Sequence, residues 1–169
     1  RLPRLVDRPG GHRPLAPIPK QPQAVLFVDH LRRRDALANS LGLRPQQRQS
    51  RQAADVCQRI LDRLTAVLNV AAVRVKVYAT RPHGRWGELQ GLYTPAEDRD
   101  LAQIEVWMRT AQRRQVVAFR TFLRTLLHEL CHHLDYELLK LPESFHTEGF
   151  YQRESSLLNQ LAPQNQTIV

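Results

Sequence analysis

The chain has 169 residues, of which 42% are hydrophobic, and its 25 basic against 16 acidic side chains give a formal net charge of +9. This length and composition predict a globular domain with a real core and exclude a disordered chain. No stretch approaches the roughly 18 consecutive apolar residues of a membrane helix, so we expect no membrane partner. The first residues lack the apolar core of a signal peptide, and the two cysteines lie in separate predicted helices. We therefore expect no disulfide and a cytoplasmic location.

The predicted elements begin with an extended arm. Six of the eleven prolines fall within the first 22 residues, and proline cannot donate a backbone hydrogen bond to a helix or an inner strand. We therefore predict a proline-rich arm over residues 1–23 and a single domain over residues 24–169. Two helices open this domain, over residues 24–40 and about 50–68, because apolar residues recur there at helical spacing. Pro45 separates them.

The hydrophobic period then changes from 3.6 to 2. Val73, Val75 and Val77 alternate with more polar residues, which predicts a half-buried strand. After a turn, two further strands are predicted over residues 88–93 and 103–109. Three short strands in succession predict a small antiparallel sheet, and we expect the last of them to present an exposed edge to an extended peptide.

A long helix is predicted over residues 115–140, and it should pack on this sheet. Its apolar side chains are Val116, Phe119, Leu123, Leu126, Leu127 and Leu130. Pro142 ends the helix, and a closing helix is predicted over residues 147–161. The order of helices and strands predicts an α+β domain.

The long helix carries an HExxH motif, His128-Glu129-Leu130-Cys131-His132. Residues four apart lie on one helix face, one turn apart, so both imidazoles can bind one Zn²⁺. Glu129 can then take a proton from a zinc-activated water as general base. A bare HExxH also arises by chance, but the flanking residues here are uncharged, as a buried ligand helix requires. The motif therefore predicts a catalytic zinc site.

A catalytic zinc needs three protein ligands and one open position. His146 is the first candidate for the third ligand, because the chain after His132 is long enough to turn and return to the metal. Glu154 is the alternative, and it would supply a carboxylate from the closing helix. Asp135 shares the face of His128, which favours a hydrogen-bond acceptor that orients an imidazole.

Three more residues near the motif have weaker predicted roles. Tyr151 and Arg153 lie within two turns after His146 and are candidate donors to a developing oxyanion. His133 points about 100° away from the neighbouring ligand, which favours a packing role.

With these residues identified, the chain resembles the SprT-like (Spartan-type) zinc metalloproteases. Their signature is an HExxH helix, a short excursion, and a histidine followed four residues later by an aromatic, here His146 and Phe150. The resemblance covers about residues 73–161. It implies a zincin-like fold and peptide-bond hydrolysis at a Zn²⁺ held by three histidines. The family often has glycine where this chain has Thr147. The minimal gluzincins are also similar, and they imply Glu154 as third ligand.

Nearly all the positive charge comes from arginine, which a solvated basic surface would explain. The alternative is a polyanionic partner, above all DNA, as the Spartan resemblance also suggests. The arginines form three groups: Arg32, Arg33 and Arg34; Arg44, Arg48 and Arg51; and Arg109, Arg113 and Arg114.

These observations together predict a zinc metallopeptidase that acts on a protein or peptide. An alternative is a SprT-like protein acting on DNA-bound proteins. The rival from another class is a non-proteolytic DNA-binding module with a structural zinc. A structural zinc usually has four ligands, commonly cysteines, which this chain does not supply.

Overall fold

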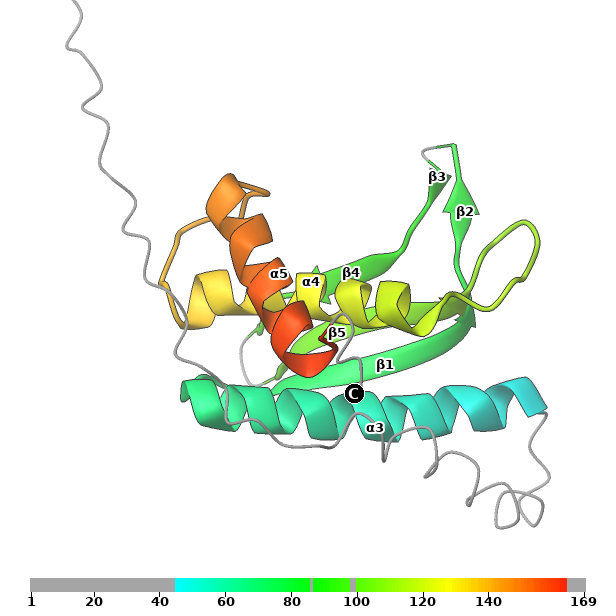
Figure 1. Ribbon diagram of the computed structural model, residues 1–169, viewed down its shortest axis with the longest axis horizontal. Coiled ribbons are helices and arrows are strands. Elements are labelled where there is room, and N and C mark those ends of the chain that lie inside the picture. Colours follow the sequence, from blue (N-terminus) through cyan, green and yellow to red (C-terminus); the bar gives the residue numbers. More distant parts are fainter. Residues whose placement is uncertain (1–44, 86, 98–99, 164–169) are drawn as a thin grey trace, which may run out of the picture.

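The computed structural model describes residues 45–85, 87–97 and 100–163 (Figure 1), and this part of the chain has an α+β fold. The predicted arm, residues 1–23, and the predicted helix over residues 24–40 lie outside the described residues. The elements, in chain order, are α3 (Pro45–Leu68), β1 (Val73–Thr80), β2 (His83–Gly84), β3 (Gly87–Glu88), β4 (Gly91–Thr94), β5 (Ala102–Arg109), α4 (Phe119–Glu137) and α5 (Glu148–Leu161).

The main sheet has the strand order β1-β5-β4, and its pairing is mixed. β5 runs parallel to β1 and antiparallel to β4. The predicted antiparallel sheet is therefore wrong for one of its two pairings. The predicted exposed edge at residues 103–109 is also wrong, because β5 is the central strand. The physical reason is burial: Ile104 and Val106 are fully buried, and a strand this apolar is most stable between two neighbours. The intervening segment is long enough for the crossover that a parallel pair needs.

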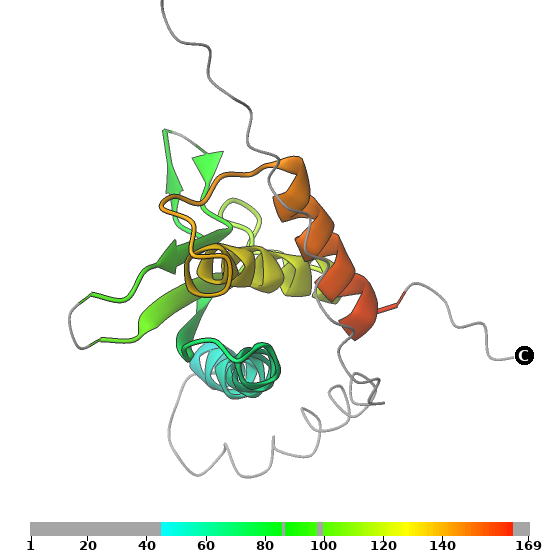
Figure 2. The same ribbon diagram turned by 90° about the vertical axis from the view of Figure 1, so that its left-hand side faces the viewer.

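All three described helices lie on the same side of the sheet (Figure 2). The predicted alternation in β1 is confirmed, because Val73, Val75 and Val77 are buried while the residues between them are exposed. These valines share one core with side chains from β5, α3, α4 and α5. The helices therefore cover the apolar face, and the site-bearing helix α4 lies against β4 and β5.

Helix α3 begins five residues before the predicted start at residue 50. Its first residue is Pro45, which the prediction used as a helix breaker. Proline is compatible with the first turn of a helix, where its missing N–H would have no intrahelical partner. Further along α3, the side-chain amide of Gln58 donates to the carbonyl of Val73 (2.9 Å) and accepts from the backbone N–H of Val75 (2.9 Å). This glutamine therefore covers the outer edge of β1 there.

Helix α4 is shorter at both ends than predicted. Before it, the chain folds back on β5, with the N–H of Val117 bonded to the carbonyl of Met108 (2.8 Å). Val116 and Phe119 are consequently 66% and 45% exposed, so their predicted core role is wrong. The four other predicted core residues are buried, at no more than 4% exposure. At the C-terminal end, Lys140 adopts a left-handed φ of 53°, which is incompatible with continued helix.

Helix α5 starts one residue after the predicted start, because Thr147 caps it. The threonine hydroxyl accepts a hydrogen bond from the N–H of Phe150 (3.3 Å). The predicted strand over residues 88–93 is divided into β3 and β4, and β3 pairs with β2 as a small hairpin. Cys57 and Cys131 are both free and buried, which confirms the expected lack of a disulfide. Among the described helices, none combines the length and apolarity needed to cross a bilayer.

Candidate metal centre

Two of the predicted ligands are held by α4. Leu126, Leu127, Leu130 and Leu134 of this helix are fully buried in the core. This apolar stripe fixes the rotation of the helix, so that His128 and His132, four residues apart, lie one above the other on a partly exposed face. Their ring centroids are 5.1 Å apart. The local helical pattern thus brings the first pair of ligands together.

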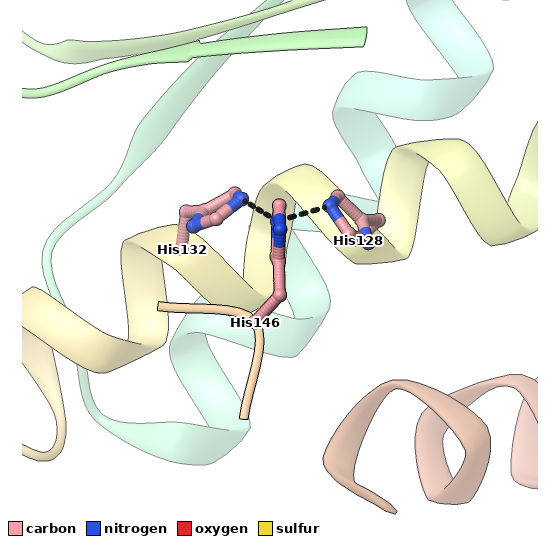
Figure 3. Close-up of side chains that lie close together, drawn as sticks. All are labelled: His128, His132 and His146. Carbon is pink, nitrogen blue, oxygen red and sulfur yellow. Dashed lines mark hydrogen bonds between the residues drawn. The ribbon is translucent and has the colours of Figure 1, made fainter. Parts of the chain in front are cut away.

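The third predicted ligand, His146, reaches this pair from the connection between α4 and α5 (Figure 3). Its Nε2 lies 2.9 Å from Nε2 of His128 and 3.1 Å from Nε2 of His132. The three side chains offer nitrogen atoms that all lie within 4.8 Å of one another. The structure therefore brings together all three histidines that the sequence selected.

Hydrogen bonds on the far side of each ring define the protonation of His128 and His132. Nδ1 of His128 lies 2.9 Å from a carboxylate oxygen of Glu154, which can only accept, so Nδ1 carries the proton. Nδ1 of His132 lies 2.7 Å from the hydroxyl of Ser144, and this hydroxyl donates to Asp135 (2.6 Å). The hydroxyl oxygen is then the acceptor for His132, so its Nδ1 is also protonated. Both Nε2 atoms consequently direct lone pairs toward His146.

Converging lone pairs repel one another unless a proton, such as one on Nε2 of His146, or a metal cation lies among them. Zinc–imidazole bonds of 2.0–2.1 Å in a tetrahedron place the nitrogens about 3.3 Å apart, close to the two separations found here. Imidazole nitrogens suit zinc and other late transition metals. The three histidines could therefore hold a metal ion of this class.

Glu129 lies beside the histidines and is 7% exposed. Burial raises the pKa of its carboxyl to about 7, and the backbone N–H of Tyr93, which donates to it, opposes the rise. The carboxylate is also close to the backbone of β4, because a Cβ on Gly91 would lie only 2.8 Å from Cδ of Glu129. Any larger residue at this point of β4 would displace the glutamate, because its Cβ would overlap the carboxylate.

The pKa of His132 is lowered to about 4, first because the ring is partly buried and then because His128 and His146 lie close by. A neutral imidazole is the form that binds a metal. At neutral pH this ring is therefore already in its ligand form.

Two carboxylates bond, directly or through a hydroxyl, to the Nδ1 edges of His128 and His132, and each also contacts an arginine. Glu154 contacts His128 through one oxygen and Arg124 through the other (3.3 Å). Asp135 contacts Ser144 through one oxygen and Arg153 through the other. Asp135 is therefore linked to His132 through the hydroxyl of Ser144. It is not bonded to His128, whose helix face it shares.

The weaker predictions have mixed outcomes. Arg153 is turned toward Asp135, so we assign it no role at an oxyanion. Tyr151 is 49% exposed, and its ring centroid lies 6.0 Å from that of His146, so it stays a candidate donor. His133 is 1% exposed, donates to the carbonyl of Ala71 (2.8 Å) and accepts from the hydroxyl of Tyr93 (3.2 Å). Its predicted packing role is confirmed.

A cleft of about 570 Å³ opens over the three histidines. Residues of β4 and its flanks line one wall, and residues of α4 line the other. The lining residues are Gln90, Gly91, Leu92, Tyr93, Pro95, Thr121, Arg124, Thr125, His128, Glu129, His132, Tyr136, Ser144 and His146. A cleft of this volume lies within the usual size range of ligand-binding pockets in proteins.

Sequence reasoning missed Ser144, Gly91 and Arg124. A glycine between two predicted strand residues is a signal of close backbone approach, and Gly91 could have been found in this way. Ser144 and Arg124 carried no comparable signal, because their roles depend on the path of the loop and on the placement of α5.

Comparisons of the chain with protein-family models, with curated proteins and with solved structures found no match.

Proposed function

We propose that this chain is a zinc-dependent metallopeptidase with a zincin-like domain. The observation that carries the proposal is the convergence of three imidazole Nε2 atoms beside a buried carboxylate, Glu129, at the base of a cleft. His128, His132 and His146 would hold the ion. Three protein ligands leave one position open, as a catalytic zinc requires.

Each residue then has a defined task. A bound zinc ion supplies Lewis acidity that polarises a carbonyl and lowers the pKa of a water molecule. Glu129 accepts the proton of the attacking water and passes it to the leaving amine. In the metal-free protein, burial raises the pKa of this carboxyl to about 7, which favours its role as a proton acceptor. Tyr151, whose exposed ring has its centroid 6.0 Å from that of His146, is the candidate donor to the oxyanion.

The substrate in this proposal is an extended protein or peptide segment that pairs with β4. A strand can be added only at an edge with unpaired backbone groups. β5 is paired on both sides, and Gln58 covers part of the outer edge of β1. The outer edge of β4 borders the cleft, as Gly91 and Leu92 line it, and on this strand the N–H of Tyr93 is bonded to Glu129. This edge takes the place of the one predicted at residues 103–109.

Among related families, we propose the SprT-like group over the minimal gluzincins. The support is the position of His146, which contacts the other two histidines, while Glu154 contacts the opposite edge of the His128 ring. The cytoplasmic location stays a prediction.

The proposal is tested by zinc content and by one substitution. The protein purified without chelators should contain one zinc per chain and should cleave an unfolded protein substrate. Glu129→Gln should keep the zinc and lower kcat by about 10²- to 10⁴-fold, because an amide cannot act as base. A parent protein that neither contains nor takes up zinc would refute the proposal. Parental cleavage by Glu129→Gln would refute the role of the base.

DNA binding is a second candidate function. One contact between two arginine-rich segments favours it. The guanidinium of Arg109 donates to the side chain of Gln49 (3.1 Å). This contact brings the loop that carries Arg113 and Arg114 next to the start of α3, where Arg51 lies. Two arginine groups that are distant in sequence thus adjoin at one end of the molecule. Such clustering suits the phosphates of DNA. The group Arg32, Arg33 and Arg34 lies outside the described residues.

Replacing Arg51, Arg113 and Arg114 together by glutamine should weaken DNA binding and reduce its dependence on salt, because fewer counterions are released. Replacing Arg59, Arg74 and Lys76 together by glutamine is the control, because these exposed residues lie elsewhere and the variant loses the same three charges. Equal losses in both variants, measured by fluorescence anisotropy at several salt concentrations, would indicate unspecific charge attraction.

A further inference from the structure

The side chain of Glu154 is almost fully enclosed, and both of its oxygens are used. The residue is 5% exposed and belongs to the buried face of α5. One oxygen accepts from Nδ1 of His128 at 2.9 Å, and the other lies 3.3 Å from Nε of Arg124. A carboxylate held at both oxygens has one orientation, and it transfers that orientation to the ring it contacts.

We infer that Glu154 is a positioning residue, which holds His128 in the ring orientation and tautomer of a metal ligand and does not itself bind the metal. The inference rests on the proposed zinc site. Nδ1 and Nε2 lie on opposite edges of an imidazole ring. Glu154 occupies the Nδ1 edge, whereas His146 meets the Nε2 edge. To reach the metal, the carboxylate would have to leave both His128 and Arg124.

The supports of the two α4 ligands differ in kind. His132 is held through a hydroxyl, Ser144, which passes the hydrogen bond on to Asp135. His128 is held by a carboxylate directly. A charge-assisted hydrogen bond is shorter and stronger than a neutral one, and it increases the basicity of the opposite nitrogen. Loss of Glu154 should therefore weaken zinc binding without removing a ligand.

The experiment compares Glu154→Ala and Glu154→Gln with Glu148→Ala. Glu148 lies on the same helix, is exposed, and contacts only Gln152 among the hydrogen-bonded pairs described for it, so its loss controls for charge. Zinc affinity is measured by competition with a chromogenic chelator, and ligand geometry by the visible spectrum of the cobalt-substituted protein. Urea unfolding of the metal-free variants detects loss of fold.

We expect Glu154→Ala to lower zinc affinity by about 10- to 100-fold, while the cobalt spectrum keeps the same coordination number. Glu154→Gln should recover part of the affinity, since its amide oxygen still accepts from His128 but carries no charge. Glu148→Ala should match the parent. Parental affinity in Glu154→Ala would overturn the inference. A changed coordination number together with equal losses in both variants would also overturn it, because that result defines a ligand.

A second measurement needs neither zinc nor a stable variant. In the metal-free parent, ¹⁵N NMR of the imidazoles should show His128 in the Nδ1–H tautomer, because the carboxylate can only accept. The opposite tautomer would overturn the inference. A parent that binds no zinc would instead refute the proposed function, so the two failures are distinguishable.

Discussion

The three histidines of the site come from two regions that are built differently. His128 and His132 stand on a buried helix, and their Nδ1 atoms are bonded to Glu154 and Ser144. His146 lies on the connection before α5 and is exposed, and its contacts are rings, with Phe150 at 5.1 Å. Helix α4 therefore places two ligands, which Glu154 and Ser144 orient before any metal binds, whereas the third ligand lies on the loop itself. A metal ion would have to fix only one side chain.

The largest effects are expected from removal of a ligand from either region. His132→Ala and His146→Ala should each reduce zinc affinity by more than the ~100-fold that loss of an orienting partner can cost. In the metal-free protein they should differ. His146→Ala should change the free energy of unfolding by less than about 0.5 kcal/mol. His132→Ala should cost about 1 kcal/mol, because Ser144 loses its hydrogen-bond partner. Chelator competition and urea unfolding measure both quantities. Parental zinc affinity in His146→Ala would remove this residue from the site.

A smaller loss of zinc affinity is expected when the residues that orient His132, Ser144 and Asp135, are replaced. Ser144→Ala should lower zinc affinity by about 10- to 100-fold and the free energy of unfolding by about 1 kcal/mol. Asp135→Ala should cause a similar loss of affinity but should cost about 3 kcal/mol, because Arg153 then loses its buried partner. The double variant should bind zinc no more weakly than the worse single variant, since Asp135 acts on His132 only through the hydroxyl of Ser144. Additive losses of zinc affinity would show that the two residues act independently.

The same comparison explains what could be predicted from sequence. His128, Glu129 and His132 follow from local helix geometry, and the buried stripe of α4 follows from hydrophobic period. The length of the loop after His132 predicts that His146 can return to the metal. The role of Glu154 could not be derived, because it depends on which edge of an imidazole faces α5. That placement is set by packing between elements far apart in the chain.

The sheet illustrates the same limit. The strands β1 and β5 could be located from their alternating patterns, whereas β2 falls in a predicted turn and β3 and β4 in one predicted strand. The pairing of β5 with β1 could not be predicted. Pairing is a competition among partners, and Val75 meets Ile104 in parallel register only after the segment between them has turned back. Local turn signals favour neighbours in sequence, so they predicted a simple antiparallel order.

The close approach of β4 to Glu129 offers a way to separate metal binding from catalysis. Gly91→Ala should displace the carboxylate, since the new Cβ would overlap it, while the three histidines stay in place. We expect zinc affinity within a few-fold of the parent and about a tenfold loss in kcat/KM, below the ~100-fold that a 1 Å misplacement can cost. Gly149→Ala is the matched control, because its Cβ would meet no atom closer than 3.5 Å. Equal activity of the two variants would show that β4 does not constrain the base.

The smallest expected effect is the pH dependence that Glu129 gives to the metal-free protein. Its pKa is raised from the ordinary 4.5 to about 7, so the folded state binds more protons than the unfolded state between these values. The free energy of unfolding should therefore fall as pH rises from 4.5 to about 7. His132, whose pKa is lowered to about 4, acts in the opposite direction as pH falls below 6.5. Because Glu129→Gln retains His132, the difference between variant and parent isolates the glutamate.

Urea unfolding in the presence of a chelator, from pH 4.5 to pH 8, measures this difference. Glu129→Gln should become more stable relative to the parent as pH rises, and the difference should level off above about pH 7, where the buried carboxyl is ionised. A difference that stays constant over this range would mean that the folded protein leaves the pKa of Glu129 at its ordinary value. The glutamate would then be an ordinary anion at neutral pH and would lose the match to proton transfer that the buried position provides.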